Sequence, residues 1–401
     1  MIPVADAIKI VLEQTPALPA ENVSVSDAGG RILAEDIVAD TDLPPFDRAQ
    51  MDGYAVRTAD VANTPARLRI VGESAAGAGW HKEMRSGEAV RIMTGAPVPR
   101  GADAVQQVEL TRELNGAGVV EILEPVELGR SIVRRAAEIK RGETVLRAGE
   151  DINAQTIATL ASFGYSQVKV GARPSVAVMA TGSELVDVNQ VPARDQIRDS
   201  NNYTIEAYAR LAGASVERLP LAGDNPEELK SLMRDAIERS DVLITSGGVS
   251  MGVYDFTKAA FKELGAEIFF ERVALRPGKP TVFSKVGGKL IFGLPGNPVS
   301  VSVTFNLFVR AALRAMQGSS QPSLTHETAL LARAVKGSVE RESYLPAVLR
   351  TDEQGTLLAE PLKWGGSSDF VAFARATALI NVPANVKLEP AAAVRFIRLP
   401  N

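Results

Sequence analysis

The chain has 401 residues, enough for roughly two to four domains, and its 45% hydrophobic and 23% charged content is ordinary for a globular protein. A net charge of −4 without a basic block argues against a nucleic-acid-binding face. The absence of cysteine excludes disulfides, thiolate nucleophiles and cysteine zinc sites, and two histidines are few for a catalytic triad or a histidine metal site. Acid–base or metal chemistry is therefore expected to use Asp, Glu, Lys or Arg.

The N-terminal residues show neither the basic segment nor the apolar stretch of a signal peptide. No apolar run approaches the ~20 residues that span a bilayer. We therefore expect a soluble, cytoplasmic protein that contacts no membrane.

The first part of the chain combines helical and β patterns. Apolar side chains at helical spacing predict a helix over residues 4–15, and a second short helix is expected over 28–34. Short Val- and Ile-rich segments between residues 65 and 123, separated by Gly and Pro, predict a small β domain. A helix is expected over residues 151–163, with Asn153 as its N-cap.

Two polar positions in this part have alternative interpretations. Asp52 lies in a polar loop between a Pro-rich break and a short strand, so it either reaches a cleft or closes a surface turn. Thr94 follows a strand and precedes a rigid Gly-Ala-Pro turn, where it either contacts a ligand or supports the turn.

Strands and helices alternate from residue 174 to residue 317, which predicts a doubly wound parallel sheet. At its centre, an apolar strand at 242–244 enters a Gly-rich turn and then a helix at 254–264. Glycines and free amides at a helix start suit an anion such as phosphate. Asp255 in this turn is either a Mg²⁺ ligand or an acid that stabilises the helix dipole.

Ligands of doubly wound sheets bind at the carboxyl ends of the strands. The groups that follow predicted strands there are Glu184, Asp224, Ser246, Gly247, Gly248, Asp255, Arg276, Lys279 and residues 293–298. Amides and cations suit a ligand with phosphate groups, and carboxylates suit Mg²⁺. Together they predict transfer chemistry at a phosphate or anhydride centre. The sequence has neither a Walker motif nor a Gly-x-Gly-x-x-Gly fingerprint, which disfavours P-loop hydrolysis and Rossmann redox chemistry.

The expected fold class is α/β plus β. Its predicted domains are an N-terminal mixed domain (1–43 and 134–173), an inserted small β domain (44–133), a doubly wound domain (174–317) and a C-terminal β domain (318–401). In the last domain, the Gly/Ser loop at 364–368 either offers backbone amides to a ligand or is a flexible turn.

Six segments together resemble the molybdopterin molybdenumtransferase family, which includes MoeA and the gephyrin E domain. They are 51–56 (MDGYAV), 91–96 (RIMTGA), 181–185 (TGSEL), 245–252 (TSGGVSMG), 276–280 (RPGKP) and 293–298 (GLPGNP). The resemblance covers nearly the whole chain, and the segments follow the order of the family. It departs at residues 134–139, where Glu138 stands in place of an Asp, and at Arg276, which stands in place of a Lys.

The resemblance implies an enzyme that inserts molybdate into adenylylated molybdopterin, releases AMP and requires Mg²⁺. It also implies a homodimer whose cleft is shared between subunits, and partners among other molybdenum cofactor biosynthesis proteins. The implied catalytic residues are Asp52, Glu184, Asp224, Asp255 and Lys279. The implied binding residues are Thr94, Thr181, Ser246, Gly247, Gly248, Arg276, Lys279, Pro295, Pro298 and Ser367, and the implied Mg²⁺ ligands are Asp255, Glu184 and Asp224.

Three alternatives stay open at this point. One is the related molybdopterin adenylyltransferase, which resembles the doubly wound domain alone. A second is an insertase specific for tungstate, and a third is a pterin-binding scaffold without turnover.

Overall fold

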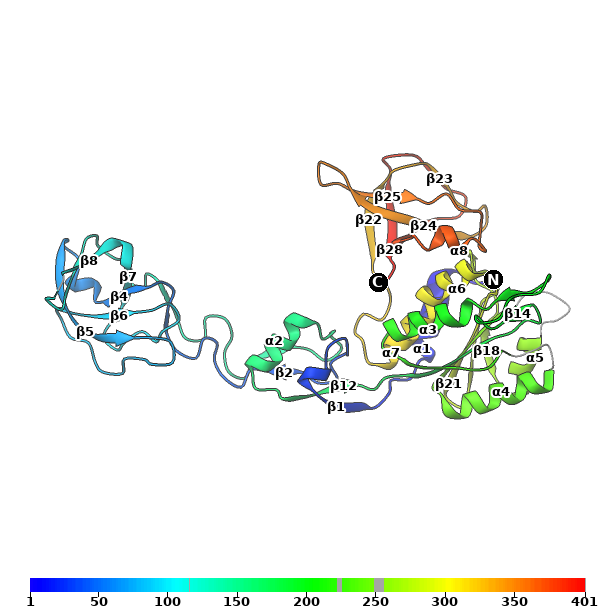
Figure 1. The fold of residues 1–401 in the computed structure, drawn as a ribbon, viewed down its shortest axis with the longest axis horizontal. Coiled ribbons are helices and arrows are strands. Elements are labelled where there is room, and N and C mark those ends of the chain that lie inside the picture. The colour runs from blue at the N-terminus through cyan, green and yellow to red at the C-terminus, as the bar shows by residue number, and fades with distance from the viewer. Residues whose placement is uncertain (115, 222–225, 249–255, 401) are drawn as a thin grey trace. The chain divides into compact units, whose positions relative to one another are not determined.

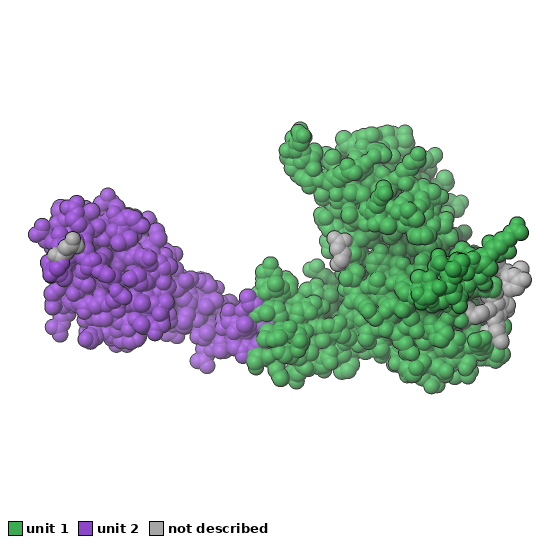
Figure 2. Space-filling view, in the orientation of Figure 1, with its two compact units in different colours: residues 1–35, 148–157, 166–401 green, residues 36–147, 158–165 purple. Residues whose placement is uncertain are grey.

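The computed structural model describes residues 1–114, 116–221, 226–248 and 256–400. The chain forms two compact units (Figure 2). The larger unit comprises residues 1–35, 148–157 and 166–401, and the smaller comprises 36–147 and 158–165. Each unit is described by itself.

The larger unit is built on a six-stranded sheet (Figure 1). Its strands, in spatial order, are β16 (Ser215–Arg218), β13 (Ser175–Ala180), β17 (Val242–Ser246), β21 (Lys289–Leu294), β20 (Val282–Val286) and β18 (Glu267–Phe270). The first four run parallel, as the alternation of strands and helices predicted.

The sheet departs from parallel pairing only at the β20 edge. β20 pairs antiparallel with β21 because only Gly287 and Gly288 join them, both at positive φ, and a two-residue turn can connect antiparallel strands only. β18 is antiparallel to β20 and therefore runs in the direction of the parallel strands. The loop that follows β18 consequently starts at the sheet edge where β13, β17 and β21 end.

Helices cover both faces of this sheet (Figure 1). On one face lie α1 (Val4–Gln14), α3 (Asn201–Leu211) and the continuous run of α6 (Pro298–Thr304), the π-helical η4 (Phe305–Val309) and α7 (Arg310–Met316). On the other lie α4 (Pro226–Arg239) and α5 (Phe256–Glu263). Alternate residues of the strands feed the two cores: Val176 and Val178 belong to the first, and Ala177 and Met179 to the second.

The helical run Pro298–Met316 is the described helix that is long and apolar enough to cross a membrane by composition. Within its most apolar window, 89% is buried inside the unit. Its hydrophobicity is therefore explained by packing in the core, beside Val4, Val11 and Phe292.

A second six-stranded sheet forms the C-terminal part of the larger unit. Its strands are β19 (Leu275–Arg276), β24 (Glu342–Thr351), β25 (Leu357–Pro361), β22 (His326–Leu331), β28 (Ala393–Arg398) and β26 (Ala378–Val382). β24 also pairs with β26, which closes the sheet into a barrel-like ring. β23 (Val335–Lys336) pairs with β27 (Lys387–Leu388), and the short helix α8 (Phe370–Phe373) follows the Gly/Ser loop.

The helix expected over residues 28–34 is absent. The only helical turn nearby is η1 (Val25–Asp27); Gly30 then takes a φ of 75°, and Ile32 and Leu33 form β-bridges to Asp151 and Val170. Two successive glycines broke the helical pattern that the apolar spacing suggested. β1 (Ala20–Ser24) pairs with β12 (Gln167–Gly171), and α2 spans Ala154–Ser162. Further along the chain, β14 (Leu185–Val186) pairs with β15 (Ile197–Arg198). The side chain of Asn153 caps α2 by accepting the amide of Thr156 at 2.9 Å, as predicted.

The smaller unit is centred on the β sheet expected between residues 65 and 123. Its strands are β7 (Ala104–Gln107), β4 (Gly53–Val56), β6 (Glu88–Ile92), β5 (Ala66–Ser74), β9 (Val119–Ile122) and β8 (Thr111–Leu114). Two antiparallel pairs accompany it: β3 (Arg48–Ala49) with β10 (Ile132–Val133), and β2 (Ile37–Val38) with β11 (Thr144–Leu146). The 3-10 turns are η2 (Thr58–Asp60) and η3 (Val108–Leu110).

Candidate functional site

The turn after β17 can be formed only by glycine. Gly247 and Gly248 have φ values of 89° and 62°. A Cβ on Gly247 would lie 2.4 Å from the carbonyl oxygen of Thr181, and one on Gly248 would lie 2.2 Å from Oγ1 of Thr257. The amide of Gly247 donates to the carbonyl of Leu294 at 3.2 Å, so this amide is occupied within the fold. The turn is thereby fixed against the loop that follows β21.

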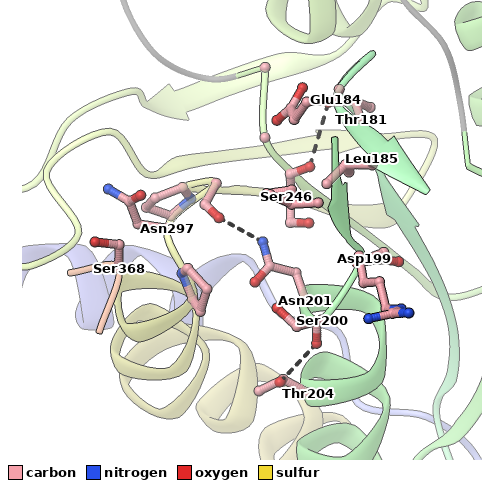
Figure 3. Close-up of a pocket in the computed structure, with 18 of the residues that line it drawn as sticks. Thr181, Glu184, Leu185, Asp199, Ser200, Asn201, Thr204, Ser246, Asn297 and Ser368 are labelled. Carbon is pink, nitrogen blue, oxygen red and sulfur yellow. Dashed lines mark hydrogen bonds between the residues drawn. The ribbon is translucent and has the colours of Figure 1, made fainter. Parts of the chain in front are cut away.

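A large cavity of about 1540 Å³ opens beside this turn (Figure 3). One end is lined by Thr181, Glu184 and the segment 246–248, and α3 contributes Asn201. The hydroxyl oxygen of Ser246 is buried and has no hydrogen-bond partner among the described residues. The cavity therefore brings hydroxyls and a carboxylate together where β13 and β17 end.

A second, cationic cavity of about 370 Å³ adjoins the large one. Arg276, Lys279 and Arg341 line it, together with Trp364 and Ser367. Arg276 ends β19 and Lys279 follows it, in the segment after β18 that starts at the sheet edge where β13, β17 and β21 end, whereas Arg341 precedes β24. Three cations around a small cavity suit an oxyanion.

The wall between the two cavities consists of the residues that line both, namely Pro280, Pro295 and Asn297. Pro295 and Asn297 belong to the loop that leads from β21 into α6. Asn201 holds this loop, because its Nδ2 donates to the carbonyl of Gly296 at 2.7 Å (Figure 3).

Asp199 is a buried carboxyl group on the wall of the large cavity, with 6% of its surface exposed. Burial raises the pKa of Asp199, against the amide and side-chain hydrogen bonds from Asn202 that lower it. The amide of Asn202 donates to Oδ1 of Asp199 at 3.1 Å. The carboxyl group therefore fixes the first turn of α3, from which Asn201 reaches Gly296.

The predicted Mg²⁺ ligands are represented in the described residues by Glu184 alone. Its carboxylate folds over Gly182, where a Cβ would lie 2.5 Å from Oε2 of Glu184. Asp224 and Asp255 lie outside the described residues. Among the residues that the structure describes, no group of three His, Asp or Glu side chains could hold a metal ion.

In the smaller unit, Asp52 and Thr94 form a close pair. Oδ1 of Asp52 accepts both the amide and the hydroxyl of Thr94, each at 2.7 Å. These two hydrogen bonds hold the pKa of Asp52 below its usual value. Glu138 forms an ion pair with Arg48 at 3.0 Å.

Most of the predicted site residues of the larger unit line the two cavities. The large cavity takes Thr181, Glu184, Ser246, Gly247, Gly248, Pro295 and Pro298, and the cationic cavity takes Arg276, Lys279, Pro295 and Ser367. The sequence reasoning missed Asp199, Asn201, Thr257 and Arg341, and it included Asn297 and Trp364 only as members of the segments 293–298 and 364–368. The run Asp199-Ser200-Asn201-Asn202 at a helix start was a usable signal, and Asn297 lay inside a quoted motif; nothing in the local sequence singles out Arg341.

Comparison with known proteins identifies the family. The MoeA N-terminal region (domain I and II) matches residues 2–164, a probable molybdopterin binding domain matches 177–315, and the MoeA C-terminal region (domain IV) matches 328–399. The molybdopterin molybdenumtransferase of Bacillus subtilis is 35% identical over 392 residues, which cover 96% of this chain and 91% of that protein. The chain belongs to the molybdopterin molybdenumtransferase family. Members of this family are enzymes of molybdenum cofactor biosynthesis.

Further relatives agree with this assignment. The molybdopterin molybdenumtransferase of Haemophilus influenzae is 36% identical over 383 residues, covering 95% of this chain and 94% of that protein. A solved molybdopterin biosynthesis MoeA structure from Pyrococcus horikoshii matches with a TM-score of 0.79 and 32% identity, covering 99% of both chains. The family thus accounts for the doubly wound sheet and for both β parts, whereas the four-domain boundaries stay a prediction.

Proposed function

We propose that this enzyme transfers molybdate onto adenylylated molybdopterin and releases AMP. The observation that carries the proposal is the shared wall between a cationic cavity and a larger cavity at the carboxyl edge of the sheet. The cationic cavity would take the oxyanion, and the large one the pterin with its phosphate groups. The family name of the curated relatives supports molybdenum as the transferred element.

The chemistry expected of this arrangement is ligand exchange without redox change. The two dithiolene sulfurs form bonds to molybdenum. One oxygen of molybdate takes up the two thiol protons and leaves as water. Water then cleaves the phosphoanhydride to give AMP. In this scheme Arg276, Lys279 and Arg341 bind and orient the dianion, which is electrostatic and positional assistance.

Four further features are part of the proposal. Mg²⁺ is expected to be required, with Glu184, Asp224 and Asp255 as its predicted ligands. Asp52 and Thr94 are expected to complete the cleft of a partner subunit in a homodimer. A cytoplasmic location and contacts with other proteins of cofactor biosynthesis are expected as well.

The proposal is tested by measuring AMP release from adenylylated molybdopterin as molybdate is titrated in the presence of Mg²⁺. We expect AMP release that rises with molybdate and stops when EDTA removes Mg²⁺. Tungstate replaces molybdate in a parallel titration, and higher efficiency with tungstate would favour the tungstate-specific alternative. Pyrophosphate release from ATP and molybdopterin would favour the adenylyltransferase, and tight pterin binding without AMP release would favour the scaffold.

A further inference from the structure

The side chain of Asn297 connects the walls of the two cavities. Its Nδ2 donates to Oγ of Ser367 at 2.9 Å, and the backbone carbonyl of Ser367 accepts the amide of Val299 at 3.0 Å. Ser367 lines the cationic cavity, and its neighbour Ser368 lines the large cavity. The Gly/Ser loop is thus attached at two points to the start of α6.

Asn297 makes this contact instead of capping its helix. It occupies the N-cap position of α6, where Asn normally accepts a backbone amide, yet its side chain makes no capping hydrogen bond. The helix therefore lacks the stabilisation of roughly 1 kcal/mol that a capping side chain usually contributes, and the side chain contacts another loop instead. Local helix stability therefore does not explain the orientation of this side chain.

The same loop contacts the glycine turn on its other side. A Cβ on Gly296 would lie 3.7 Å from the Cα of Gly247, and Gly247 is hydrogen-bonded to Leu294. Asn201 fixes Gly296 from α3. A continuous chain of contacts therefore runs from the turn at Gly247, through Gly296 and Asn297, to Ser367.

Of the described residues that line both cavities, Asn297 alone has a hydrogen-bonding side chain, since Pro280 and Pro295 have none. We propose that Asn297 is a positioning residue that, through its hydrogen bond to Ser367, couples occupancy of the large cavity to oxyanion binding in the cationic cavity. This inference rests on the proposed function, in which the pterin and the oxyanion meet across this wall. Asn297 acts through Ser367 and is assigned no bond-forming role.

Coupling is measurable without turnover. Trp364 lines the cationic cavity, and the only other tryptophan, Trp80, belongs to the smaller unit. Molybdate is titrated while Trp364 fluorescence is recorded, once without AMP and once with saturating AMP, which serves as a probe of the large cavity. The experiment uses a Trp80→Phe background, so that Trp364 is the only tryptophan that contributes to the signal. In the parent protein, which retains Asn297 and Ser367, we expect AMP to change the Kd for molybdate by roughly fivefold, which is within the usual range of coupling between two sites.

The decisive variants are Asn297→Ala and Ser367→Ala. Each should reduce the effect of AMP on the molybdate Kd to less than about twofold, and the double variant should behave like either single one because both remove the same hydrogen bond. Asn189→Ala is the matched control: Asn189 is exposed, its Nδ2 donates to Asp187 at 3.0 Å, and it lines neither cavity. The control should retain the full coupling.

Turnover provides the second readout. Both variants should lower kcat for AMP release by roughly tenfold and shift the KM for molybdate by about the fivefold coupling that they lose. Absence of coupling in the parent, or retention of full coupling and kcat in both variants, would overturn the inference. If the parent protein shows coupling that the variants lose, but releases no AMP, the proposed function is overturned and the positioning role stays supported.

Discussion

Arg276 of β19 lies opposite Ser343 of β24 in a parallel strand pair. This pairing joins the loop after the central sheet to the C-terminal sheet within the larger unit. It brings Arg341, two residues before Ser343, to the cavity that Arg276 and Lys279 line. The third cation of the cavity is therefore supplied by a different part of the chain.

Arg341→Gln should weaken oxyanion binding. The loss of one charged hydrogen-bond donor typically costs about 1.5–3 kcal/mol, so the molybdate Kd measured by Trp364 fluorescence should rise at least about tenfold. Lys9→Gln, which removes an exposed cation that lines neither cavity, serves as the control. An unchanged Kd in Arg341→Gln would show that Arg341 does not bind the oxyanion.

Gly247→Ala should abolish productive binding in the large cavity. The added Cβ would lie 2.4 Å from the carbonyl oxygen of Thr181, so the turn must move. Gly265→Ala carries the same left-handed backbone cost at a φ of 79° but meets no atom within 4 Å, and Gly265 lines neither cavity. AMP binding by calorimetry should fall by more than tenfold in the first variant and stay within about twofold in the second. Equal losses in both would indicate a general backbone effect.

Asp199→Asn should change how stability depends on pH. Because burial raises the pKa of Asp199 above its usual 3.8, its favourable contribution is complete at lower pH and is lost as pH rises through the folded-state value. Asn does not ionise and still accepts the amide of Asn202 through Oδ1. The free energy of unfolding of the variant, relative to the parent, should therefore rise between pH 4 and pH 7 in urea titrations. A constant difference across this range would contradict the assigned pKa shift.

Thr94→Val should raise the pKa of Asp52 toward its ordinary value. The variant loses the hydroxyl hydrogen bond at 2.7 Å but keeps the backbone amide bond, so part of the lowering should remain. The pKa is measured by NMR titration of the Asp52 carboxyl carbon. Asp42, whose pKa is lowered by hydrogen bonds from the amide of Arg141 and the side chain of Arg135 elsewhere in the smaller unit, is the internal reference, and its pKa should not change.

Local sequence predicted the features that depend on local geometry. The apolar strand ending at Ser246, the glycines after it and the helix from Phe256 follow from hydrophobic spacing and from the backbone freedom of glycine. The position of Arg276 and Lys279 at the sheet edge where β13, β17 and β21 end was also predictable, because both residues follow β18, which runs in the direction of those strands.

Features that depend on pairing between distant segments were not predictable in the same way. Arg341 reaches the cationic cavity only because β19 pairs with β24, and no local pattern encodes that pairing. The direction of β20 depends on the Gly287-Gly288 turn, which makes it antiparallel to β21. The alternation of helices and strands, on which the prediction rested, does not show this change of direction. The helix expected at 28–34 is absent because Gly29 and Gly30 interrupt it, and Ile32 and Leu33 form β-bridges to Asp151 and Val170 instead.

The most direct test of the central claim is anomalous X-ray diffraction at the molybdenum edge from crystals of the protein soaked with molybdate and AMP. We expect a molybdenum peak whose bound oxygens lie within hydrogen-bonding distance of Arg276, Lys279 and Arg341, and AMP in the adjoining cavity beside Ser246. Molybdenum bound on a surface away from these three cations, with their cavity empty at saturating molybdate, would contradict it.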